Sequence, residues 1–145
     1  MRDILVPLSP GELLDKITIL RIKAVRITDP AKRRNVEVEL GLLTATWRDS
    51  GCVPEADSDG ARALAEDERA LQAVNERLWD IEDRIREKES RQCFDREFVE
   101  LARAVYLSND ERAAIKRRIN LRLGSRIVEE KSYSPYRRSV YSAPQ

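Results

Sequence analysis

Basic side chains that could hold an anion are the most suggestive functional feature of this chain. Lys16 lies at the edge of the apolar face of the first predicted helix, and Arg103, Arg112 and Lys116 lie toward the end of the helical region. Guanidinium and ammonium groups bind carboxylates and phosphates through charge-assisted hydrogen bonds. With Glu82 as a weak candidate for a general acid or base, these residues could form a site for an anionic small molecule.

The same cations also have a structural explanation. Lys16 could pair with Glu12 one helical turn earlier. The last predicted helix is basic and the predicted helix at 61–89 is acidic, so the two could face each other through salt bridges. A binding site would gather the cations beside Trp79 or Tyr106, whereas a scaffold would pair each of them with a carboxylate of the acidic helix.

A polar stripe along the predicted helix at 61–89 supplies two more ligand-binding candidates, Trp79 and Arg86. Its members recur every three or four residues and so share one side of the helix: Asn75, Trp79, Glu82, Arg86 and Glu89. The structural alternative, which we favour, is an interhelical salt-bridge face with Trp79 packed over its edge.

The C-terminal segment combines aromatic and basic residues. Tyr133, Tyr136, Arg137 and Arg138 are typical of interface anchors, and we treat them as interface candidates. The segment could dock on another protein or on a second subunit, or be a disordered end.

Several kinds of chemistry lack the residues they need. The chain has no His, and its two cysteines, Cys52 and Cys93, lie far apart without metal-ligand spacing. A glycine-rich phosphate loop and a nucleophile elbow are also missing. We therefore expect no metal and no cofactor, and we favour a role without catalysis.

Charge and hydropathy set the expected surroundings. A net charge of +1 and a short basic helix beside an acidic one disfavour nucleic acid as a partner. The apolar run at 4–6 ends at Pro7, and no stretch is long enough to span a membrane. Unpatterned cysteines are typical of a reducing compartment, so we expect a cytoplasmic protein.

The elements that must position these residues are helices. Charged residues make up 37% of the chain and apolar residues 41%, a mixture typical of amphipathic helices. Ser9-Pro10-Gly11-Glu12 predicts a capped helix start, and the helix that follows is apolar nearly all round, as a central helix would be. Leucines and isoleucines at heptad spacing predict a coiled-coil seam in the third helix.

We therefore predict an all-α bundle of about five helices in a single domain at 1–124, which begins with a short extended segment. The expected parts are a helical hairpin at 10–49, a loop at 50–60, a long helix at 61–89, two shorter helices within 95–123, and a tail at 125–145 that is mobile or docked.

Four segments of the chain resemble a bacterial family of small helical proteins of unknown function. They begin VPLSPGELLDKITILRIKAVRI and continue with VNERLWDIEDRIREKE, FVELARAVYLSNDERAAIKRRIN and SRIVEEKSY, so the resemblance spans residues 6–133. It implies a bacterial, cytosolic protein and no particular mechanism.

Two functional hypotheses follow. The first is a non-catalytic helical module that forms a homodimer and binds another protein. The alternative is a small-molecule site for an anionic metabolite, loosely analogous at the level of fold to chorismate mutase, a small helical dimer that needs no His.

Overall fold

The computed structural model describes residues 2–136, and these form four α-helices. In chain order they are α1 (Pro10–Arg26), α2 (Pro30–Asp49), α3 (Asp59–Ser90) and α4 (Arg96–Arg122). Strands are absent from the described residues, so the chain is all-α as predicted.

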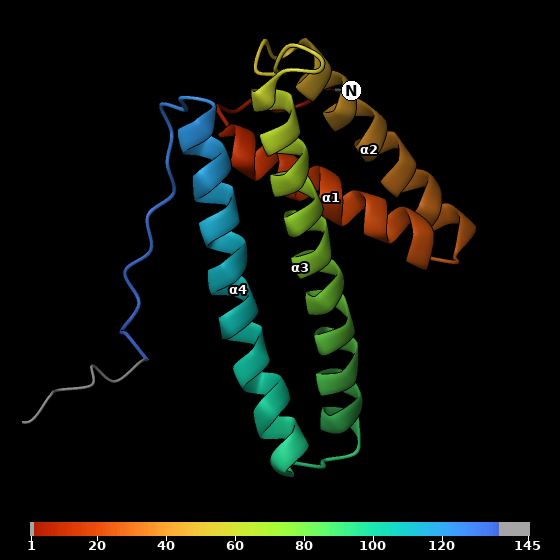
Figure 1. Cartoon of the computed structure of the whole chain (residues 1–145). Coiled ribbons are helices and arrows are strands. Elements are labelled where there is room, and N and C mark those ends of the chain that lie inside the picture. The colour runs from red at the N-terminus through yellow and green to blue at the C-terminus, as the bar shows by residue number, and fades with distance from the viewer. Residues whose placement is uncertain (1, 137–145) are drawn as a thin grey trace, which may run out of the picture.

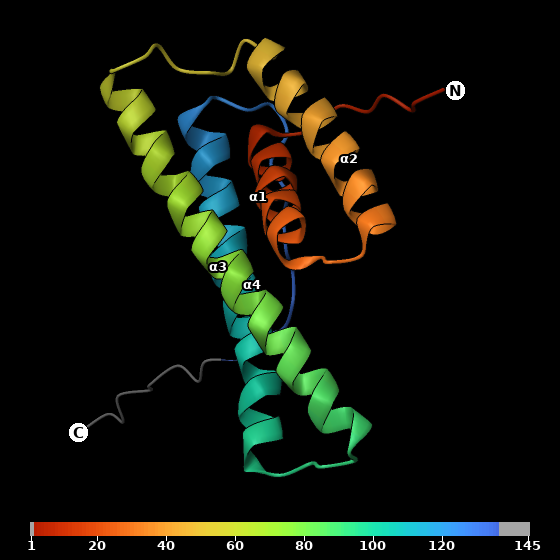
Figure 2. The same cartoon turned by 90° about the vertical axis from the view of Figure 1, so that its right-hand side faces the viewer.

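The two long helices set the shape of the molecule. α3 and α4 run side by side as an antiparallel hairpin, α1 lies across one half of it, and α2 packs on the other side of α1 (Figures 1 and 2). Within residues 2–136, α1 contacts all three other helices, whereas α2 contacts α1 alone. The half of the hairpin nearest the α3–α4 turn extends beyond α1 and α2.

Side-chain caps define where each helix begins. Four short polar residues, each directly before a helix, accept a hydrogen bond from the backbone N–H three positions on: Ser9, Asp29, Ser58 and Asp95. Pro10 and Pro30 occupy the first helical positions, where the missing N–H costs nothing.

The core forms where α1 meets the α3–α4 hairpin. Leu14 and Ile17 of α1 pack with Leu71 of α3 and Ile119 of α4, and all four side chains are at most 1% exposed. The all-round apolar character of α1 follows from this position, because α1 is enclosed by the other three helices.

The predicted fourth and fifth helices are one continuous helix, α4, so the expected count of five was wrong. Ser108 and Glu111 have the spacing of a capping box, which is typical of a helix start, but both lie inside α4. The buried Ser108 hydroxyl instead accepts a hydrogen bond from Arg77 Nε on α3 at 3.3 Å, and Glu111 forms an ion pair with Arg77. Both polar side chains are thus used between helices rather than to start one.

The heptad seam of α3 packs inside the chain. Its Leu64, Leu71 and Leu78 are all buried, against α1 and α4. The seam therefore needs no second copy over this part of its length. Only toward the hairpin turn, at Ile85, does it become partly exposed.

The segments outside the bundle differ in how they pack. Residues 2–8 belong to no helix, and Ile4 and Leu5 are 89% and 92% exposed. The described part of the tail, 125–136, runs along α4, where the Tyr136 ring lies 5.1 Å from that of Tyr106. The interface candidates Arg137 and Arg138 lie outside the described residues.

Among residues 2–136, none of the helices is both long enough and apolar enough to cross a bilayer.

Candidate functional site

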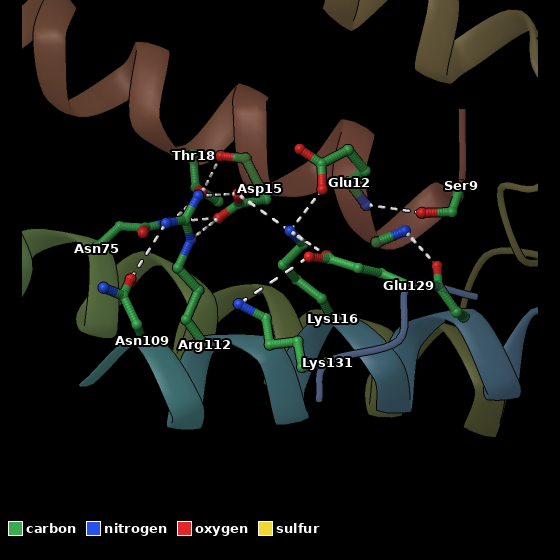
Figure 3. Close-up of polar contacts among 12 residues, drawn as sticks. Ser9, Glu12, Asp15, Thr18, Asn75, Asn109, Arg112, Lys116, Glu129 and Lys131 are labelled. Carbon is green, nitrogen blue, oxygen red and sulfur yellow. Dashed lines mark hydrogen bonds and ion pairs between the residues drawn. The ribbon is translucent and has the colours of Figure 1, made fainter. Parts of the chain in front are cut away.

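A wholly buried carboxylate, Asp15 of α1, joins α1 to both long helices (Figure 3). Arg112 of α4 donates to it through two nitrogens, with Nε 2.9 Å from Oδ1 and Nη2 bonded to Oδ2. Asn75 of α3 donates from Nδ2 to Asp15 Oδ1 at 2.9 Å and to Thr18 Oγ1 at 3.0 Å. A buried charge is tolerated when it is paired and fully hydrogen-bonded, and this arrangement satisfies both conditions.

Arg112 is therefore committed to a partner. The hydrogen bond to Asp15 raises the pKa of Arg112, against the opposing effect of burial, and the nearby charges of Asp15 and Glu12 raise it further. The guanidinium stays charged, but most of its charge is balanced by Asp15.

Lys116, one helical turn further along α4, is surrounded by carboxylates (Figure 3). Its Nζ lies 2.5 Å from Glu12, 3.2 Å from Glu129 of the tail and 3.8 Å from Asp15. Burial lowers the pKa of Lys116, but the hydrogen bond to Glu12 and the charge of Asp15 outweigh it, so the net shift is upward. Lys116 thus holds α1, α4 and the tail together and has little charge left for an anionic ligand.

The start of α1 touches α4 at its backbone. Gly11 N–H donates to Asn120 Oδ1 at 2.7 Å, and both residues are buried. A Cβ on residue 11 would lie 2.5 Å from the Lys116 carbonyl oxygen, so only glycine permits this approach. The contact fixes the register in which Asp15 meets Arg112 one turn later.

Beside the Asp15–Arg112 pair is a groove of about 430 Å³ between α1, α3 and α4. Its apolar lining comes from Ile19, Ile22, Leu78 and Trp79. Its polar lining comes from Lys23, Asn75, Glu82, Asp83, Asn109 and Arg112. We call this the three-helix groove.

Several polar atoms in the three-helix groove have unused hydrogen-bonding capacity. Asn75 donates to Asp15 and Thr18, but its Oδ1 accepts nothing from residues 2–136. Asn109 uses its Oδ1 in a long contact of 3.5 Å from Arg112, and its Nδ2 donates to none of the described residues. The ammonium group of Lys23 likewise forms no hydrogen bond or ion pair within the described part of the chain. These groups could serve a ligand.

Trp79 forms the most distinctive wall of the groove. Arg26 stacks on its ring, with the guanidinium carbon 5.8 Å from the ring centroid, and Arg26 also pairs with Asp80. Arg26 of α1 thus contacts two adjacent residues of α3, the ring of Trp79 and the carboxylate of Asp80. Glu82, one turn on from Trp79, pairs with Arg86 at 3.2 Å.

The structure brings together some of the residues singled out from the sequence and separates others. Trp79, Glu82 and Arg112 meet in the three-helix groove. The side chains of Lys16 and Arg103 are exposed, do not line the groove, and form no ion pair or hydrogen bond with residues 2–136.

The alternative of facing acidic and basic helices holds only for part of α4. Arg118 and Arg122 both bond the buried Asp67 of α3, at 2.6 Å and 3.2 Å. Arg112 and Lys116, in contrast, pair with carboxylates of α1.

The interface candidates Tyr133 and Tyr136 lie with Tyr106 around a second cavity of about 410 Å³ between the tail and α4. Lys131 lies 5.7 Å from the Tyr133 ring centroid, so a cation of the chain itself already faces this ring.

Some residues of the site were not singled out from the sequence. Asn109 and Asn120 stand at helical spacing from Arg112 and Lys116 on α4, and that spacing was the only available signal. Nothing local marks an Asn as the partner of a backbone or a ligand from another helix.

The fold and its site define an all-α protein with a groove where three helices meet. Residues 4–143 match the profile of a family described as a family of unknown function, DUF6165. The chain belongs to this family, which confirms the resemblance at the family level. No curated protein and no solved structure matches the chain.

Proposed function

We propose that this chain binds a small molecule in the three-helix groove. The observation that carries the proposal is the meeting of Trp79, Glu82 and Arg112, from two helices and distant parts of the sequence, at one concave surface. Sites for small molecules are concave, have a largely apolar lining, and contain a few polar groups that fix the ligand's orientation. The groove has these properties, and its volume of about 430 Å³ suits a metabolite.

The charges of the groove argue against the purely anionic ligand that was expected from the sequence. The charge of Arg112 is balanced by Asp15, and that of Lys116 by Glu12 and Glu129. These two cations are therefore not free to hold an anion. A ligand with an apolar part against Trp79 and polar groups toward the asparagine amides fits better. We propose binding and assign no reaction to the site.

Thermal unfolding against a panel of small molecules tests this function. The panel covers nucleotides, sugar phosphates, dicarboxylates, free sugars and amino acids. A ligand at a hundredfold excess over its dissociation constant adds about 2.7 kcal/mol to the unfolding free energy, which raises the midpoint by several degrees in a domain of this size.

A matched pair of variants assigns any shift to the groove. Asn109→Ala removes an amide from the groove lining, and Asn35→Ala removes one from the exposed surface of α2. We expect the ligand-dependent shift to shrink in the first variant and persist in the second. No shift with any member of the panel, or one that survives Asn109→Ala unchanged, would contradict the proposal.

A second candidate function is a homodimeric interaction module, supported by the part of the hairpin that extends beyond α1 and α2 (Figure 2). There Ile85, Phe98 and Val105 line a shallow groove of about 330 Å³ with a rim of alternating charge. Phe94 and Val99 nearby are 55% and 53% exposed. Two such hairpins, packed face to face, would bury these groups as a four-helix bundle does.

The rim charges favour a second copy as the occupant. Glu82, Arg86 and Glu89 alternate in sign along α3, and such a stripe complements itself when two copies meet antiparallel. Arg86→Glu removes this complementarity, while Arg33→Glu breaks a similar exposed helical pair on α2. Light scattering should give a dimer mass for the wild type and Arg33→Glu and a lower mass for Arg86→Glu. A one-chain mass for the wild type at micromolar concentration would contradict the dimer.

We also propose a cellular location and a domain organisation for this chain. The free thiols of Cys52 and Cys93 support a reducing cytosol. The common core of α1, α3 and α4 supports a single domain at residues 1–124.

A further inference from the structure

The three-helix groove carries charges of both signs on different helices. Lys23 projects from α1, whereas Glu82 and Asp83 belong to α3. A groove built for an anion would concentrate cations, and one built for a cation would concentrate carboxylates. In this groove the ammonium group of Lys23 lies on the α1 side, and the carboxylates of Glu82 and Asp83 lie on the α3 side.

These charges do not neutralise one another. The side chains of Lys23 and Asp83 form no ion pair or hydrogen bond with any described residue, so neither pairs with the other. Glu82 bonds Arg86 through Oε2 alone, and the Arg86 side chain is 78% exposed. An exposed helical pair of this kind is weak, so Glu82 remains available to a ligand.

The groove also offers a hydrogen-bond acceptor and a donor of its own. Asn75 Oδ1 and Asn109 Nδ2 are both without a partner among residues 2–136. Asn75 is held in place by Asp15 and Thr18, so its acceptor is presented in a fixed orientation.

The apolar lining sets the remaining requirement. The side chains of Ile22 and Leu78 are mostly buried, but both border the groove, and Trp79 also lines it. A ligand that displaces water from these side chains gains the hydrophobic contribution to binding. The ligand must therefore combine an apolar group with opposite charges.

We infer that the groove binds a zwitterion with an apolar side group, that is, a free amino acid of the aromatic or branched aliphatic kind. Its carboxylate faces Lys23, its ammonium group faces Glu82 and Asp83, and its side group lies against Trp79. The inference rests on the proposed binding function and specifies the ligand of that same site.

Four probes of similar shape test the inference by calorimetric titration at pH 7. Phenylalanine carries both charges, 3-phenylpropionate the negative one, phenethylamine the positive one, and N-acetylphenylalaninamide neither. A charged hydrogen bond in such a site changes affinity about tenfold or more. We therefore expect phenylalanine to bind about tenfold more tightly than either singly charged probe, and the neutral probe to bind most weakly.

Variants of the two walls should respond in opposite ways. Lys23→Met should weaken the binding of phenylalanine and of 3-phenylpropionate but leave the binding of phenethylamine unchanged. Glu82→Gln should weaken the binding of phenylalanine and of phenethylamine but leave the binding of 3-phenylpropionate unchanged. This reciprocal pattern supports the assignment of each wall.

Two results would overturn the inference. One is equal binding of all four probes, and the other is no measurable binding of phenylalanine and of leucine. If another molecule still shifts the unfolding midpoint in an Asn109-dependent way, the zwitterion is wrong and the proposed function stands. If no molecule does, both fail together.

Discussion

The carboxylate of Asp15 on α1 and the guanidinium of Arg112 on α4 form a two-pronged ion pair between residues 97 positions apart in the sequence. The Asp15 side chain is 1% exposed and that of Arg112 is 28% exposed. The pair crosses the interface where α1 lies on the α3–α4 hairpin, and Arg112 also borders the three-helix groove. The same contact thus holds the bundle together and fixes one wall of the proposed site.

Removing the charge of Asp15 should destabilise the fold strongly. Asp15→Asn keeps the shape of the side chain but leaves the guanidinium of Arg112 without its counter-charge, and breaking a buried pair in this way costs about 3–5 kcal/mol. Chemical denaturation measures the loss. Glu37→Gln, which breaks an exposed pair with Arg33 on α2, should change stability by no more than about 0.5 kcal/mol.

Coupling between the two residues is a sharper test. Because the penalty comes from an unpaired charge, Asp15→Asn combined with Arg112→Met should be less destabilised than the sum of the two single variants. If the losses in stability were additive, the Asp15–Arg112 ion pair would not be what holds the two side chains in the fold.

Glycine should be required at position 11 and dispensable at position 41. Gly11→Ala places a Cβ 2.5 Å from a backbone oxygen of α4, which cannot move without shifting the helix, and overpacking of this kind costs about 1–3 kcal/mol. Gly41 of α2 has no atom within 4 Å of the same added Cβ, so Gly41→Ala should stabilise the protein by about 0.5–1 kcal/mol. Opposite signs in thermal unfolding would confirm the close crossing of α1 and α4, and equal effects would contradict it.

The starts of α1 and α2 were predictable because they depend on neighbouring residues. The start of α3 was placed two residues too late, since α3 begins at Asp59 with Ser58 as its cap. Ser9 before Pro10 and Asp29 before Pro30 combine a side-chain acceptor with a residue that needs no N–H partner, and both signals are local. Ser108 looked like another start for the same local reason. It lies inside α4 because its hydroxyl contacts Arg77, a partner 31 residues away that local reasoning cannot supply.

Asp95 should titrate unusually low. The hydrogen bond from Lys88 lowers its pKa from 3.8 to about 2, with help from the Phe98 N–H at the start of α4. Since the folded-state value lies below the unfolded one, the stability from this contact is complete above about pH 3.8 and is lost as the pH falls through about 2.

Carboxyl NMR titration of Asp95 checks this directly. In Lys88→Met its pKa should rise, yet stay below 3.8 because the Phe98 N–H still donates. Arg91→Met, which removes an exposed pair with Glu87 nearby, should leave the titration of Asp95 unchanged. A normal pKa in the wild type would contradict the Lys88–Asp95 contact.

The candidate site was only partly visible in the sequence. Trp79 and Glu82 shared a helical stripe and Arg112 stood on a basic helix, so their types and spacing drew attention. Their meeting depends on the packing of α3 against α4. The groove that they border also needs α1, which the Gly11 and Asp15 contacts hold across this hairpin. Such contacts join residues about 100 positions apart, and no periodic pattern in the sequence encodes them.

The two tryptophans provide the most direct test of ligand binding in the three-helix groove. Trp79 lines the groove, whereas Trp47 of α2 packs at the edge of the core and does not border it, so the two indole N–H signals of a ¹⁵N-labelled sample report on different places. Titration with phenylalanine, or with whichever molecule raises the unfolding midpoint, should move the Trp79 signal saturably and leave that of Trp47 in place. A saturable shift of Trp47 with Trp79 unmoved would contradict the site, as would two signals that never move.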